Sequence, residues 1–237
     1  MVKLTLSDIS LADIKQLVKL REQTGTEHEW TQVKSIALTE NEQRQVQDIR
    51  SRLINTQVHL FNEATVWARA IYPLLLLAER DSIQAWAGVT LQTRYPTFEI
   101  DGIADGVLGK SLAGRIETPY LIVVETKRGI EAQSPIFQLY GQLLAAAHLN
   151  WENNQQEPQE IFGCYTIADS WTFLRAEVAG IDSEMPSLQV EYSREYTEKV
   201  DAALILKILK GIVARFFEQP EDNELNTEPD IPLATEL

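Results

Sequence analysis

The segment that most constrains the fold is an apolar run that ends in two charged side chains. Residues 120–124 read Tyr-Leu-Ile-Val-Val, and Pro119 stands directly before them. Such a β-branched, apolar run favours a buried strand, and proline is tolerated where a strand begins. Because side chains alternate across a strand, Glu125 and Lys127 should lie on one face. Burying these charges is costly unless a metal ion, a phosphate or the opposite charge satisfies them.

A second acidic residue lies in the preceding extended segment, residues 98–108. Asp105 stands there among glycines that allow a bulge or a close backbone approach. Residues 110–118 contain Ser, Gly and charged side chains, which predicts a hairpin connection. If the two strands pair antiparallel, Asp105 lies beside Glu125. Two adjacent carboxylates repel each other unless a cation lies between them, and such oxygen ligands suit Mg²⁺.

A helix that carries two glutamines is expected after this strand. Ser134 is a good N-cap, and Pro135 fits the first helical position. Gln138 and Gln142 are four positions apart and therefore share one stripe of the helix. The apolar residues of this segment follow helical spacing on another stripe: Ile136, Tyr140, Leu143, Leu144 and Ala147.

These residues together resemble the motif of a known family of nucleases. Gly102-x-x-Asp105, then Glu125-x-Lys127 at the end of an apolar strand, then a helix bearing Gln, resembles the PD-(D/E)XK nuclease superfamily. Among its restriction-endonuclease-like members, the N-terminal nuclease domain of type I restriction motor subunits is similar. The resemblance implies that Asp105 and Glu125 bind Mg²⁺, for which Mn²⁺ can substitute. It also implies that Lys127 orients or activates the attacking water.

Two assisting residues are implied by the same resemblance, which covers roughly residues 62–178. Many family members carry Gln-x-x-x-Tyr on this helix, with the Gln near the active site. This chain has Gln138 at the first position but Gln142 where the Tyr would stand. The family pattern therefore supports Gln138 and speaks against Gln142. Members also often carry a Glu on the first core helix, and Glu63 occupies a fitting place.

Each of these residues also has a purely structural interpretation. Glu125 and Lys127 can form a solvated cross-strand ion pair, while Asp105 caps a turn. A carboxylate such as Glu63 is favoured by the dipole at a helix N-terminus, whatever else it does. Gln138 and Gln142 can simply form the polar edge of a helix.

The elements around the motif predict an α/β fold with the order αβββαβ. A helix over 62–79, capped by Asn62 and kinked at Pro73, precedes strands at 83–94, 98–108 and 120–124. The glutamine-bearing helix and a strand at 161–168 follow, with a hairpin partner at 171–178 and a helix over 196–217. This is the order of the restriction-endonuclease-like core, a mixed central sheet flanked by helices.

The domain organisation follows from these elements. Residues 1–61 are predicted to form an N-terminal helical extension, in which Thr39 and Glu42 make a capping box. Residues 62–217 form the nuclease-like core with a C-terminal helix. Residues 218–237 form a flexible acidic tail, because they contain three prolines and seven acids without Lys or Arg.

Charge and cysteine content limit the partners and the compartment. The 237-residue chain has a net charge of −14, of which the segment 218–237 supplies seven negative charges, leaving −7 for the rest. This balance counts against tight non-specific binding to DNA. The single cysteine, Cys164, excludes an internal disulfide framework. The sequence shows no signal peptide and no apolar run long enough to span a bilayer, so a cytoplasmic protein without a membrane partner is expected.

The sequence thus predicts a Mg²⁺-dependent endonuclease that hydrolyses DNA phosphodiester bonds. The alternative is a nuclease-like DNA-binding or assembly subunit that does not cleave, which the acidic balance favours. A homodimer, and restriction or repair proteins as partners, are compatible with either interpretation.

Overall fold

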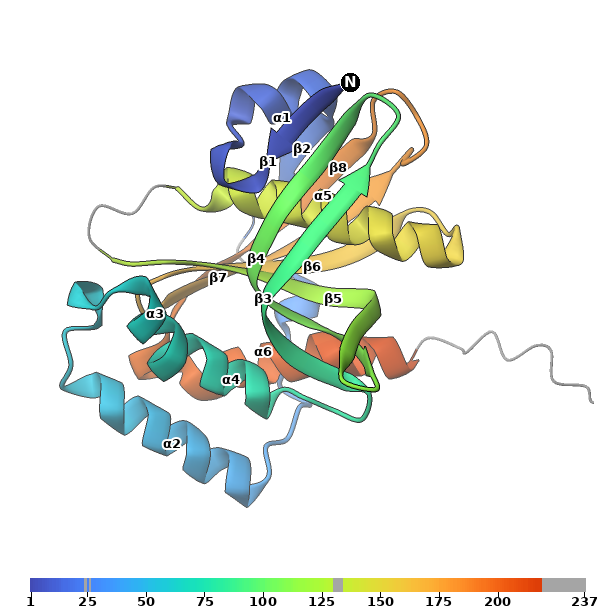
Figure 1. Cartoon of the computed structure of the whole chain (residues 1–237). Helices are drawn as coiled ribbons and strands as arrows, with labels where there is room; N and C mark the ends of the chain where they lie inside the picture. The colour runs from blue at the N-terminus through green and yellow to red at the C-terminus, as the bar shows by residue number, and fades with distance from the viewer. Residues whose placement is uncertain (24, 26, 130–133, 219–237) are drawn as a thin grey trace, which may run out of the picture.

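The predicted apolar run forms the middle of a long strand in a curled, mixed sheet flanked by helices (Figure 1). The computed structural model describes residues 1–23, 25, 27–129 and 134–218. Within them, eight strands form one sheet: β1 (Val2–Thr5), β2 (Lys19–Gln23), β3 (Ile83–Arg94), β4 (Phe98–Leu112), β5 (Arg115–Lys127), β6 (Gln159–Ile167), β7 (Ser170–Ala179) and β8 (Ser187–Thr197). Their order is β1-β4-β5-β6-β7-β8-β2, and β3 pairs antiparallel with β4.

Helices cover both faces of this sheet (Figure 1). α5 (Ile136–Asn154) packs on one face, and α1 (Leu11–Leu17) and a short 3₁₀ turn, η1 (Leu6–Asp8), contact α5. The helices of the other face are α2 (Glu40–Ile54), α3 (Glu63–Val66), the π-helical segment η4 (Trp67–Ile71), α4 (Tyr72–Leu77) and α6 (Glu198–Glu218). Two further 3₁₀ turns are η2 (Glu29–Thr31) and η3 (Val58–Leu60).

The alternation of β5 side chains divides the interior into two apolar cores. Val123 packs in the core under α5, whereas Ile122 and Val124 pack in the core under α6. All three side chains are fully buried. β5 is therefore covered on both faces, as the continuous apolar run predicted.

Several predicted elements are confirmed. From Glu63 to Ile167 the elements follow the order αβββαβ, and β3 spans the predicted residues 83–94. β4 and β5 pair antiparallel, and β6 and β7 form the predicted hairpin. Thr39 and Glu42 form the capping box at the start of α2, and Asn62 caps α3 through a hydrogen bond to the Thr65 amide. Among the described residues, no helix is long and apolar enough to cross a membrane.

The helical interpretation of residues 1–61 is wrong in part. This segment contains α1 and α2, but it also supplies β1, which pairs parallel with β4, and β2, which pairs parallel with β8. Both strands are short and lie at the margins of the sheet. Leu4 is the one residue of β1 that is buried, so the strand carries almost no periodic signal. α1 is capped by Ser10, which forms a capping box with Asp13.

Other predicted boundaries shift in the structure. The hairpin connection lies within residues 110–118, as predicted, but it is shorter, because β4 and β5 continue to a tight turn at Ala113 and Gly114, both with left-handed φ. Pro119 lies inside β5, opposite the register shift at Gly109, rather than at the strand entrance. Residues 187–197 form β8, so the last helix begins at Glu198 rather than at 196.

Two further corrections concern helix ends and the tail. α5 begins at Ile136, with Pro135 at the N-cap position and no side-chain cap, so Ser134 does not cap it. Of the predicted acidic tail 218–237, residues 219–237 lie outside the described residues.

A buried acid at the start of α6 generates a first prediction. Glu198 is fully buried; its Oε2 accepts a hydrogen bond from Trp171 Nε1 at 3.0 Å, while Oε1 has no hydrogen-bond partner among the described residues. Burial raises the pKa of Glu198, and the charge of Asp169 raises it further, against the bond from Trp171. The folded protein therefore favours the neutral acid.

Glu198→Gln should stabilise the protein increasingly as the pH rises above the pKa of an unfolded glutamate. The unfolded chain then loses a proton that folded wild type retains, so wild-type stability falls by up to about 1.4 kcal/mol per pH unit. Urea unfolding between pH 4 and pH 8 measures this difference, with the exposed Glu184→Gln as control. A Glu198→Gln effect that is constant with pH would contradict a neutral Glu198.

Candidate active site

The pairing of β4 with β5 brings Asp105 to Glu125. Gly106 pairs with Val124, so the next positions along the two antiparallel strands are Asp105 and Glu125. Oδ2 of Asp105 accepts a hydrogen bond from the backbone N–H of Thr126 at 2.6 Å. Asp105 is thus fixed against β5 rather than capping a turn.

Glu125 is a buried carboxylate held from both sides. Its Oε1 lies 2.5 Å from Nζ of Lys127, in an ion pair. Its Oε2 accepts a hydrogen bond from Nε2 of Gln142 on α5 at 2.6 Å. The side chains of Glu125 and Lys127 are 0% and 21% exposed, so they do not form a solvated surface pair.

The charges of this group shift the pKa values of its members. Burial and the nearby charge of Asp105 raise the pKa of Glu125 to about 7, although Lys127 and Gln142 oppose the shift. Burial also raises the pKa of Asp105, against the Thr126 amide and the Lys127 charge. Burial alone would lower the pKa of Lys127, but Glu125 outweighs it and the pKa is raised. Both carboxyl groups therefore ionise less readily than usual, whereas the lysine stays protonated.

The two predicted assisting residues, Glu63 and Gln138, lie in different surroundings in the structure. Glu63 is exposed in the first turn of α3, and its negative charge raises the pKa of both Asp105 and Lys127, so it lies near the group. Gln138 is half-buried, and its side chain makes no hydrogen bond to any described residue. The family pattern favoured Gln138 over Gln142, yet Gln142 is the glutamine that reaches Glu125.

A contact that sequence reasoning missed positions the first helix beside Asp105. A Cβ atom added to Gly106 would lie 2.3 Å from Cη2 of Trp67, so the indole occupies the space above this glycine. Trp67 begins the π-helical segment, one helical turn after Glu63. A glycine next to Asp105 in a strand was the available signal, because such a glycine often marks a close approach.

The donor set fits a magnesium ion that is bound by few protein ligands. Among the described residues, no group of three or more His, Cys, Asp or Glu side chains is placed to hold a metal. Asp105 and Glu125 supply two carboxylates, and Mg²⁺ commonly takes one or two of these together with waters and substrate phosphate. Oδ1 of Asp105 has no hydrogen-bond partner among the described residues, which leaves it open to a ligand.

No protein-family model matches the chain, and no curated protein is significantly similar to it. The interpretation of Asp105, Glu125 and Lys127 therefore rests on their own geometry and on the motif.

The buried ion pair generates a second prediction. Lys127→Met should destabilise the protein by about 3 kcal/mol at pH 8, because it leaves Glu125 buried without its cation. The loss should be smaller at pH 5, where the carboxyl remains protonated in the folded variant. Without Lys127, the pKa of Glu125 in the folded variant exceeds its unfolded value by more than in the wild type. The variant therefore loses stability as the pH rises.

Urea unfolding at the two pH values, in the presence of a metal chelator, measures this effect. Lys15→Met is the matched control, because Lys15 is exposed on α1. Equal destabilisation by Lys127→Met at both pH values would show that Glu125 does not depend on Lys127.

Proposed function

We propose that the chain is a Mg²⁺-dependent nuclease that hydrolyses phosphodiester bonds of DNA. The observation that carries the proposal is Glu125, wholly buried beside Asp105 and held between Lys127 and Gln142. An ion pair that only stabilised the fold would gain little from such burial, because desolvation offsets its Coulombic attraction. Perturbed, mutually facing carboxylates with an adjacent lysine are instead typical of reactive centres.

The arrangement of elements supports the same proposal. Asp105 and Glu125 come from neighbouring antiparallel strands within an αβββαβ sequence of elements. We therefore infer that residues 62–178 form a restriction-endonuclease-like core. Because the resemblance rests on few residues, the spatial proximity of Asp105, Glu125 and Lys127 adds support that their spacing in the sequence does not supply.

The residues of this chain would divide the chemistry among them. Asp105 and Glu125 would hold the metal, with Gln142 and the Thr126 amide fixing their orientation. Bound Mg²⁺ lowers the pKa of a water ligand and stabilises charge on the phosphate oxygens.

Lys127 has a role that follows from its protonation. Its raised pKa keeps the ammonium charged at neutral pH, so it can orient the attacking water or stabilise the developing negative charge. It does not act as a base in this state. Glu63 and Gln138 would assist from the edge of the site; among the described residues, neither forms a hydrogen bond or ion pair with Glu125.

A second candidate is a nuclease-like DNA-binding or assembly subunit without cleavage activity. The charge of −7 that remains outside residues 218–237 favours the assembly role of such a subunit over tight DNA binding, since DNA binding depends on neutralising phosphates. Binding alone does not require two carboxylates and a lysine in one buried group. We therefore place hydrolysis first; a cytoplasmic location, a homodimer and restriction or repair partners stay predictions.

A cleavage assay on duplex, single-stranded and branched DNA with Mg²⁺ or Mn²⁺ tests the proposal. Asp105→Ala should abolish both cleavage and metal binding, because it removes a ligand. Lys127→Ala should reduce the cleavage rate by about 100-fold or more while metal binding persists. Asp101→Ala is the matched control, since Asp101 lies on the same strand but pairs with Lys3 at the surface.

The results test the assignment of the residues and distinguish the two candidate functions. Wild-type activity in both Asp105→Ala and Lys127→Ala would reject the assignment of these residues. DNA binding by the wild type without cleavage under any of these conditions would favour the non-catalytic subunit.

A further inference from the structure

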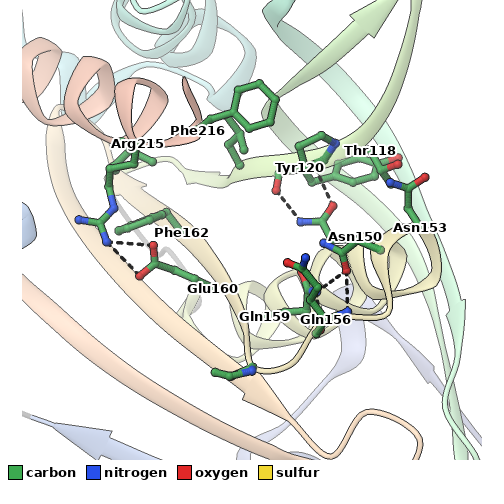
Figure 2. Close-up of a pocket in the computed structure, with 15 residues that line it drawn as sticks. Thr118, Tyr120, Asn150, Asn153, Gln156, Gln159, Glu160, Phe162, Arg215 and Phe216 are labelled. Atoms are coloured by element: carbon green, nitrogen blue, oxygen red, sulfur yellow. Dashed lines mark hydrogen bonds and ion pairs between the residues drawn. The ribbon is translucent and has the colours of Figure 1, made fainter. Parts of the chain in front are cut away.

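A separate pocket lies toward the opposite end of β5 from Glu125 (Figure 2). Its volume is about 300 Å³, and it is lined by Thr118–Leu121, the last turns of α5, residues leading into and beginning β6, and the end of α6. Tyr120 and Glu125 are five residues apart along one strand, or about 16 Å. The pocket therefore does not belong to the candidate active site.

The charges of this pocket are already paired. Among its lining residues, all within the described part of the chain, only Arg215 and Glu160 are charged. Nη2 of Arg215 lies 3.1 and 3.3 Å from the two carboxylate oxygens of Glu160. Oε2 of Glu160 also accepts a hydrogen bond from Nε of Arg175 at 2.5 Å. A phosphate or carboxylate ligand would have to displace Glu160. The pocket thus suits a neutral ligand.

Amide side chains that are already fixed line one side of the pocket. Asn150 exchanges two hydrogen bonds with the backbone of Tyr120, at 2.7 and 2.8 Å. Both N–H groups of Gln159 are used, since Nε2 donates to Oδ1 of Asn154 at 2.8 Å and to the Gln156 carbonyl at 2.6 Å.

These bonds leave a donor and an acceptor in defined positions. Oε1 of Gln159 accepts no hydrogen bond from the described residues, and Nδ2 of Asn154 donates none. Gln159 is only 6% exposed, so its orientation is set by the fold. Side-chain amides whose orientation is fixed before binding lose little conformational entropy when a ligand binds. This favours recognition of a ligand with a complementary donor and acceptor pair.

Aromatic and apolar side chains form the other sides. Figure 2 shows Phe162, Phe216 and Tyr120 around the space, with Asn150 and Gln159 along its lower edge. Flat apolar walls beside amide groups suit a planar, neutral heterocycle that carries both donors and acceptors. Nucleobases have this chemistry, since they stack on aromatic rings and hydrogen-bond through their edges. The volume is at the lower end of ligand pockets and suits a single nucleoside.

We propose that this pocket binds one nucleobase, from a free nucleoside or from an unpaired nucleotide of a nucleic-acid strand. The inference does not depend on the proposed nuclease activity. Binding should be insensitive to divalent metal, because no residue of the candidate active site lines the pocket.

Calorimetric titration of the full chain with adenosine, guanosine, cytidine and uridine tests the proposal, with glucose as a non-planar neutral ligand. A second arm uses labelled single-stranded oligonucleotides in a metal chelator, which prevents cleavage. Gln159→Leu and Phe216→Ala should each weaken binding by about tenfold, through loss of a hydrogen-bond acceptor and of an aromatic wall. Phe61→Ala is the matched control, because Phe61 does not line the pocket and packs against Arg69.

The outcomes distinguish the two sources and the two proposals. Saturable nucleoside binding weakened in both pocket variants but not in Phe61→Ala supports the proposal, and the same pattern with oligonucleotides alone assigns the base to a strand. Asp105→Ala should bind as wild type does, even if it cleaves nothing. If Gln159→Leu does not fold, the comparison of Phe216→Ala with Phe61→Ala decides. No saturable binding, equal binding by all variants, or preference for glucose would overturn the proposal.

Discussion

The arrangement of the central strands depends on satisfying one buried carboxylate. Glu125 has no exposed surface, and a charge in that position must be paired and hydrogen-bonded. Lys127 reaches it from the same strand, and Gln142 reaches it from the helix that crosses above. β4 and α5 therefore both contribute a side chain to the group around Glu125: Asp105 comes from β4 and Gln142 from α5. A shift of α5 by one residue would remove the hydrogen bond from Gln142 to Glu125, and a shift of β4 would remove the bond from the Thr126 amide to Asp105.

The connection between β5 and β6 explains why Gln142 lies over Glu125. These two strands are parallel neighbours, so the chain must cross the sheet between them, and α5 makes that crossing. The helix returns over the face that carries Val123, Glu125 and Lys127. The same crossing leaves the last turns of α5 at the other end of β5, where Asn150 holds Tyr120 and helps form the pocket.

The sequence could predict the features that depend on local periodicity. The alternation of side chains placed Glu125 and Lys127 on one face. Asp105 and Glu125 lie on two strands joined by a short hairpin, so their proximity depends on residues that are close in the sequence. Helical spacing alone could not decide between Gln138 and Gln142, because that choice depends on where α5 crosses β5. The contact of Trp67 with Gly106 depends in the same way on distant packing. Within β8, Leu188 and Val190 do alternate with polar residues, so this strand carried a signal that the sequence analysis missed.

The acidity of the protein and the proposed chemistry are connected through the metal. Among the described residues, three acids act on the Lys127 ammonium near the candidate site: Glu125, Glu63 and Asp105. A DNA phosphate approaching this group would meet net repulsion, since unit charges close together interact strongly outside bulk water. In the proposed function, a divalent cation would reverse that balance and leave the lysine available to the phosphate. Substrate binding at this site would then be coupled to metal binding, and an acidic chain could act on DNA without a large basic surface.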